Sequence, residues 1–407
     1  MSDSVASSPP MLARAASTGR RLAEMDGARG ILSMWVLLVH VIYLSGYLLD
    51  TIDPAYRAVL YGQEAVDVFI IMSGFVIFRL LSLKSEPYRV YIVRRFMRMF
   101  PVFLVCLAFA IAVRPLMWEL LQELPYPVER AQRMQVAMMQ SEDESFWLHL
   151  ATHLTLLHGV IPDAKFPFST LALLAPSWSI SLEWQFYLIA PVVFALLKKK
   201  NRWWTAALVV LTIVVAMVGF YVFSSKYYAP SFLPIRVQFF AMGILSWFIW
   251  ERWSGEDGKA VVRADLLIWL FPLVYFLTSS PAMTMWFVLL MATFAGQRDQ
   301  VRGLGSGMSW VLKRKTLVYL GDTSFSMYLS HMTCIYVCQW VLHRMYPEIS
   351  REGMFPLLLL PSLISSLIIT ALLNHYIEKP GMDLGKRWGN HLNRHTARQG
   401  VVAVSQH

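Results

Sequence analysis

Long apolar runs recur from residue 31 to residue 377, and they constrain the fold of this chain more than any other feature. Hydrophobic residues make up 57% of the sequence and charged residues only 15%, whereas soluble domains carry roughly 25% charge. A helix needs about 20 apolar residues to cross a bilayer, and lipid tolerates no unpaired backbone. The chain is therefore expected to be an all-α polytopic membrane protein with about ten transmembrane helices. The expected spans are 31–50, 66–83, 99–117, 177–197, 203–223, 233–250, 264–279, 281–296, 317–343 and 354–377.

Basic residues are distributed unevenly between the expected loops. If the N-terminus is cytoplasmic, 26 of the 36 Lys and Arg residues fall on the cytoplasmic side and 8 on the other. The positive-inside rule then predicts that both termini are cytoplasmic. The same asymmetry accounts for most of the net charge of +10, so no nucleic-acid partner is implied.

The segments outside the spans divide the chain into three parts. Residues 1–24 are Ser-, Ala- and Arg-rich without the apolar core of a signal peptide, which predicts a disordered cytoplasmic tail. Residues 25–380 form the membrane domain, with an external loop at about 114–175, and residues 381–407 form a basic cytoplasmic tail. A helix is expected around residues 145–158, where His149 and His153 are one turn apart. No third ligand follows in a zincin arrangement, so no metal site is predicted.

Arg29 and His40 lie on one face of the first expected span. Eleven helical residues rise about 16 Å, so Arg29 lies at the membrane boundary and His40 about half-way through a core of roughly 30 Å. An ionisable side chain at that depth costs free energy and usually has a function. The pair indicates a ligand with a charged head and a reactive tip.

Three arginines, Arg94, Arg95 and Arg98, precede the apolar part of the third span and are expected to occupy one helical face at the cytoplasmic boundary. One interpretation is an ordinary positive-inside cluster. The other is a phosphate clamp, because guanidinium groups present planar pairs of donors to phosphate oxygens. Together with Arg29, the cluster favours a polyphosphate ligand that arrives from the cytoplasm.

Other polar side chains are expected to reach similar depths. Glu183 lies about 10 Å into the fourth span, with Tyr187 one turn further, and His331 lies about 21 Å from the cytoplasmic end of the ninth. Packing alone does not explain an intramembrane glutamate, whereas a satisfied core histidine is an equal alternative for His331. On the second span, Asp67 marks the outer boundary, and Ser73 beside a glycine favours close helix packing.

These segments resemble the acyltransferase-3 family of integral membrane O-acyltransferases, which includes O-antigen and Nod-factor acetylases. The resemblance extends from about Asp26 to Pro380. Five motifs carry it in order: Arg29-x10-His40, Asp67…Ser73-Gly74-Phe75, Arg94-Arg95-x-x-Arg98, Ser177-Trp-Ser-x-Ser-x-Glu183-x-x-Phe-Tyr187 and Ser326-x-Tyr328-Leu-x-His331.

The resemblance implies transfer of an acyl group, commonly acetyl, from cytoplasmic acyl-CoA to a hydroxyl of a carbohydrate or glycolipid at a bacterial inner membrane. Some members carry a fused SGNH domain, and none is expected in this chain. The donor phosphates would be held by Arg29, Arg94, Arg95 and Arg98. No metal is required.

His40 is expected to act either as the general base on the acceptor hydroxyl or as a carrier of the acyl group, and the sequence does not separate these routes. Glu183 is expected to orient His40. The supporting residues are Asp67, Ser73, Ser177, Tyr187, Tyr328 and His331, with Ser177, Tyr187 and Tyr328 as candidate donors to the oxyanion. The rival interpretations are a transporter or flippase, or a glycan polymerase. The repeated halves typical of many transporters are not evident.

Overall fold

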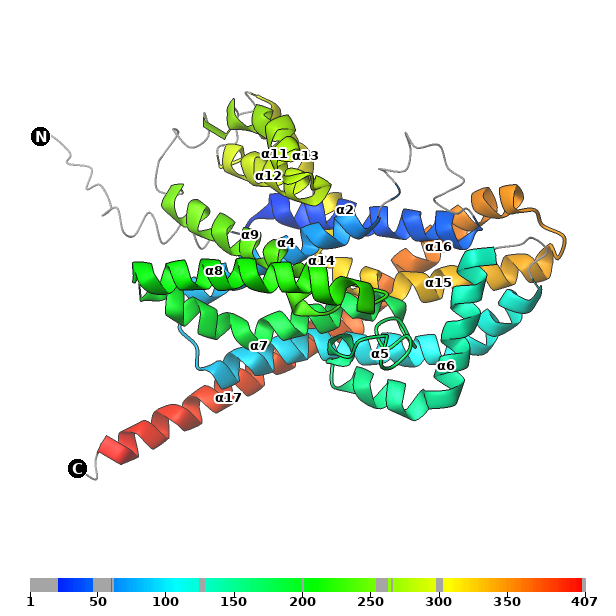
Figure 1. Ribbon diagram of the computed structural model, residues 1–407, viewed down its shortest axis with the longest axis horizontal. Coiled ribbons are helices and arrows are strands. Elements are labelled where there is room, and N and C mark those ends of the chain that lie inside the picture. The colour runs from blue at the N-terminus through cyan, green and yellow to red at the C-terminus, as the bar shows by residue number, and fades with distance from the viewer. Residues whose placement is uncertain are drawn as a thin grey trace, which may run out of the picture. The chain divides into compact units, whose positions relative to one another are not determined.

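Every regular element that the computed structural model describes is helical (Figure 1), as the apolar runs predicted. The described residues are 21–46, 60, 62–123, 129–199, 201–253, 263–264, 266–297 and 303–404. Most of the expected disordered tail therefore lies outside them, and the first described helix begins at Ala23.

The described elements are α-helices and short 3₁₀ or π turns. The α-helices are α2 (Ala23–Leu44), α4 (Gly62–Leu83), α5 (Tyr88–Glu123), α6 (Glu129–Leu154), α7 (Trp178–Lys198), α8 (Arg202–Val218), α9 (Leu233–Trp253), α11 (Phe271–Thr278), α12 (Pro281–Ala295), α13 (Leu304–Leu312), α14 (Lys315–Asp322), α15 (Ser324–Met345), α16 (Arg351–Leu373) and α17 (Lys379–Val404). The 3₁₀ and π turns are η2 (His158–Val160), η3 (Ala175–Ser177), η4 (Gly219–Phe223), η5 (Ser224–Lys226), η6 (Ile268–Leu270) and η7 (Asn374–Glu378).

Seven helices among the described residues are long and apolar enough to cross a membrane, so the chain is a polytopic membrane protein. The expectation of about ten spans is met in part. Spans seven and eight correspond to the shorter apolar helices α11 and α12. They are joined at Ser279, whose φ of 50° makes a tight turn between them. The cytoplasmic placement of both termini stays a prediction.

The ninth expected span, 317–343, is wrong as a single helix. The structure divides it into α14 and α15, with a break at Thr323, where φ is −102° and ψ is 0°. Asp, Thr and Ser follow one another here, and such short polar side chains compete with the helix for backbone hydrogen bonds. Helix α6 consists of two helices that meet at a kink at Ser145, so the helix expected at 145–158 begins where the sequence predicted and ends at Leu154.

The chain forms two compact units, which we describe separately. The first contains residues 1–32, 67–85 and 239–322. In it Gly74 of α4 packs against the backbone of Phe240 on α9, and Gly243 of α9 packs against Ile71. A side chain at either glycine would collide with the facing backbone, so the predicted close packing beside Ser73 is confirmed.

The second unit contains residues 33–66, 86–238 and 323–407. Helix α15 packs against α5 and α16, and α17 runs along α5 (Figure 1). One apolar core joins Leu37 and Val41 of α2 to Ile335 of α15 and Leu358 of α16. This core fixes the end of α2 that carries His40 against the middle of α15.

The segment that leads into α7 is held by a buried carboxylate. Asp163 accepts hydrogen bonds from the backbone N–H and hydroxyl of Thr170, from the Ser169 hydroxyl, and from the backbone N–H of Tyr228. Burial nevertheless raises the pKa of Asp163, because the carboxylate is desolvated. These bonds fix the loop that positions the first turn of α7.

Candidate active site

The structure brings His40 of α2 and His331 of α15 into contact. Their ring centroids are 4.9 Å apart in an edge-to-face arrangement, and His331 Nε2 lies 3.3 Å from His40 Nδ1. His331 is 1% exposed, whereas His40 is half-buried. The two ionisable groups that the sequence placed inside separate spans therefore form one pair.

The backbone hydrogen bonds assign the tautomers of this pair. His40 Nδ1 lies 2.8 Å from the carbonyl oxygen of Val36, and His331 Nδ1 lies 2.7 Å from that of Tyr328. Because a carbonyl only accepts, we assign the proton to Nδ1 in both neutral rings. The Nε2 lone pair of His331 then faces the Nδ1–H of His40, which leaves the His40 Nε2 lone pair for proton transfer.

Helix α7 presents Ser179, Glu183 and Tyr187 at four-residue intervals, so they share one face. The hydroxyls of Ser179 and Tyr328 are hydrogen-bonded at 3.0 Å, and the Tyr328 ring lies 5.9 Å from that of His331. Tyr187 donates its hydroxyl proton to the Glu183 carboxylate. One end of this face therefore meets the histidine pair through Tyr328.

The other end of the same face meets the arginine segment of α5. The Arg95 guanidinium carbon lies 6.0 Å from the centroid of the Tyr187 ring, and Arg95 lies within electrostatic range of Glu183 and Arg98. Arg95 Nε and the Tyr91 hydroxyl are both buried without a hydrogen-bond partner in the described part of the chain. Two neighbouring buried donors without acceptors fit an anionic ligand. Tyr91 was not among the residues that the motifs predicted.

Arg94 points elsewhere. It pairs with Glu86, and its Nη2 donates to Asn390 Oδ1 of α17 at 2.9 Å. Adjacent residues on a helix are about 100° apart, so Arg94 and Arg95 face different neighbours. Within the predicted arginine cluster, Arg94 therefore contacts α17, whereas Arg95 contacts α7.

Three predicted residues lie in the other compact unit. Arg29 is half-buried on α2, and Asp67 and Ser73 are 3% and 9% exposed on α4. Their expected roles stay predictions.

Ser177 is fully buried, and its hydroxyl lies 3.2 Å from His158 Nε2. The ring of His153 stacks on His158 at 4.0 Å, and His153 Nδ1 donates to the backbone oxygen of His149 at 2.8 Å. Burial lowers the pKa of His149 and His153 to about 4 and that of His158 well below its usual range, so all three are neutral near pH 7. The described residues contain no group of three side chains suited to a metal ion.

A buried carboxylate that the sequence did not single out fixes the start of α15. Ser326 donates to Glu378 Oε2 at 2.6 Å, and Asn374 Nδ2 donates to the same oxygen at 3.1 Å. Asn374 and Glu378 begin and end a π-helical turn, a feature often found at functional sites. The contact sets the position of the Ser326-x-Tyr328-Leu-x-His331 motif.

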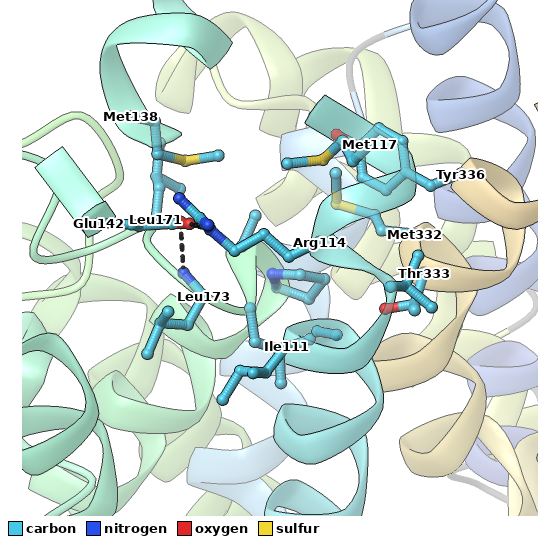
Figure 2. A pocket seen from close by; sticks show the side chains of 15 residues that line it. Ile111, Arg114, Met117, Met138, Glu142, Leu171, Leu173, Met332, Thr333 and Tyr336 are labelled. Atoms are coloured by element: carbon cyan, nitrogen blue, oxygen red, sulfur yellow. Dashed lines mark hydrogen bonds and ion pairs between the residues drawn. The ribbon is translucent and has the colours of Figure 1, made fainter. Parts of the chain in front are cut away.

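Figure 2 shows a pocket in the second unit, between α5, α6, α15 and the segment before α7. Its walls are largely apolar, and Arg114 lies at one side, paired with Glu142 at 2.7 Å. Met332 and Thr333, which directly follow His331, line the opposite side. Residues of the expected external loop therefore share a pocket with the helix that carries His331.

Comparison with known proteins identifies the family. A protein of Komagataeibacter xylinus named "Putative membrane-bound transacylase BcsY" is 23% identical over 373 residues, which cover 90% of this chain and 84% of that protein. No solved structure matches the chain. The family model Acyl_transf_3, described as an acyltransferase domain, matches residues 22–375. The chain therefore belongs to the acyltransferase-3 family and is a membrane-bound acyltransferase that transfers groups other than aminoacyl groups.

Proposed function

We propose that this enzyme transfers an acyl group, acetyl in the simplest case, from cytoplasmic acyl-CoA to a hydroxyl of a carbohydrate or glycolipid. The observation that carries the proposal is the pairing of His40 with His331, because it leaves one imidazole nitrogen available as a base inside the membrane domain. The family assignment supports an enzyme over the transporter, flippase and polymerase alternatives.

In the proposed reaction, His40 Nε2 takes the proton of the acceptor hydroxyl as its oxygen attacks the thioester carbonyl. The tetrahedral intermediate then expels the CoA thiolate, which receives that proton from His40. While His40 is protonated, its Nδ1–H donates to the Val36 carbonyl and to His331 Nε2, which stabilises the positive charge. In this proposal His331 supplies the contact that was expected from Glu183.

We assign the hydrogen bond to the oxyanion to Tyr328, one of the three residues expected to donate it. Its ring adjoins His331, and its hydroxyl is held by Ser179. Ser177 is instead engaged by His158, and the Tyr187 hydroxyl by Glu183. Tyr328 is favoured over both because its ring adjoins the histidine pair.

We assign the donor phosphates to the end of the site formed by Arg95 and Arg98, where the unpartnered donors of Arg95 and Tyr91 lie. The expected contribution of Arg29 stays part of the proposal, and Arg94 supports the site indirectly. We propose that this end faces the cytoplasm, with both termini on the same side of a bacterial inner membrane.

The test is transfer of radiolabelled acetyl from acetyl-CoA in membranes that contain wild type or His40→Ala, with the cellular glycans fractionated afterwards. His375→Ala is the matched control, because it removes an exposed histidine. We expect glycan labelling by wild type and the control and a loss of about 10²- to 10⁴-fold with His40→Ala. Equal labelling by all three variants would remove His40 from the mechanism.

The carrier route differs in its intermediate. If His40 itself accepts the acyl group, rapid quenching without an acceptor should recover label bound to wild type and not to His40→Ala. The base route predicts no bound label under these conditions.

A further inference from the structure

Helix α17 begins at Lys379, beyond the residues 22–375 that match the family domain. It runs along α5, the helix that carries the arginine segment (Figure 1). Gly381, Gly385 and Gly389 recur at four-residue intervals and are buried, whereas most residues between them are exposed. The contact face of α17 is therefore a glycine stripe.

The stripe packs where larger side chains have no space. A Cβ atom on Gly385 would lie 2.8 Å from Met97 Cβ, and one on Gly389 would lie 2.8 Å from Arg94 Nε. Real Cβ atoms essentially never approach other heavy atoms this closely. Small residues at this spacing allow two helix backbones to approach. The approach occurs at the turn of α5 that contains Arg94 and Arg95.

A polar contact fixes the rotation of α5 at the same place. The side-chain oxygen of Asn390, next to Gly389, accepts a hydrogen bond from Arg94 at 2.9 Å, and Glu86 pairs with the same guanidinium. Arg95 follows Arg94 at about 100° around the helix, so anchoring Arg94 sets the direction of Arg95 toward Tyr187.

We propose that α17 is a brace, added to the family domain, that positions the arginine segment for the acyl-CoA head group, with Gly385 and Asn390 as positioning residues. The inference rests on the proposed function, in which Arg95 and Arg98 hold the donor phosphates. Arg94 then contributes through its anchoring of α5.

The experiment measures binding of coenzyme A to the purified full-length protein by calorimetry. Asn390→Ala, at an exposed position, should weaken binding about threefold to tenfold, because it removes one hydrogen bond from Arg94. Asn390→Asp keeps the acceptor oxygen and should bind as wild type does. Gly385→Leu should weaken binding more than tenfold, and Arg387→Leu places the same side chain at an exposed position as the matched control.

Packing is tested apart from binding by the Tm of the same variants, because Gly385→Leu should lower the Tm and Arg387→Leu should not. An unchanged Tm in Gly385→Leu would overturn the brace, as would wild-type affinity in both Asn390→Ala and Gly385→Leu. Equal weakening by Asn390→Ala and Asn390→Asp would also overturn it, because the acceptor oxygen would then be irrelevant. If wild type itself does not bind coenzyme A, the proposed donor site is wrong and the inference falls with it.

Discussion

Removal of His331 tests the division of labour within the histidine pair. In the structure, His331 Nε2 lies 3.3 Å from His40 Nδ1, while the Val36 carbonyl lies closer, at 2.8 Å. His331→Ala therefore leaves the tautomer of His40 in place and removes one of two acceptors that stabilise its charged form. The ring of His331 exchanges no proton with the substrates in this scheme.

The expected magnitude follows from the length of that contact. Hydrogen bonds to charged groups contribute about 1.5–3 kcal/mol, and a separation of 3.3 Å is longer than the usual 2.9–3.0 Å. We therefore use the lower end of this range, about 1.5 kcal/mol, and a change of about 1.4 kcal/mol in the activation free energy changes the rate tenfold. We expect His331→Ala to lower kcat about tenfold and to leave the KM for acyl-CoA unchanged.

The assay is the initial rate of acetyl transfer over a range of acetyl-CoA concentrations, corrected for the amount of enzyme in the membrane. His331→Gln restores an acceptor oxygen and should recover part of the rate, and His375→Ala should match wild type. A loss with His331→Ala as large as that with His40→Ala would refute the reasoning, since His331 would then be a proton-transfer group. An unchanged rate would refute it as well.

Three further outcomes follow from other contacts. Arg95→Ala should raise the KM for acyl-CoA about tenfold to hundredfold, and Arg95→Lys should recover little, because lysine lacks the planar donor pair; steady-state kinetics measures both. Between pH 6.5 and about pH 4, His153 binds a proton in the unfolded protein but not in the folded protein, where it is buried. The Tm should therefore fall as the pH is lowered through this range, and it should fall less steeply in His153→Gln. Gly74→Leu should lower the Tm and the yield of folded protein, because the new side chain meets the backbone of Phe240, whereas Gly307→Leu has open space and should not.

The sequence predicted the helices that carry the important side chains better than it predicted the partners of those side chains. Periodicity and span boundaries were enough to place His40 and His331 inside separate helices. Their contact depends on the registry of α2 against α15, which is set by core residues such as Val41 and Ile335. That registry arises from packing between distant segments and is not encoded in the spacing of either motif.

Local geometry explains the other differences. Arg94 and Arg95 are adjacent in the sequence, so on a helix their side chains point about 100° apart. This difference could have been predicted from the sequence. The glycine stripe of α17 was likewise readable as a close-packing motif in what was expected only as a basic tail. The contact between Ser177 and His158 was not readable, because it depends on the fold of the loop before α7.

The order of side chains along α7 gives the proposed site a direction. Tyr187 adjoins Arg95, and Ser179 adjoins Tyr328. Tyr187 and Ser179 are separated by about 12 Å along the helix. Glu183 lies between them with its carboxylate bonded to Tyr187, so an anionic head group is attracted by the arginines and repelled from the middle of the face. We infer that a donor on this face is held with its phosphates at the arginine end, while its uncharged arm extends toward Tyr328 and the histidine pair.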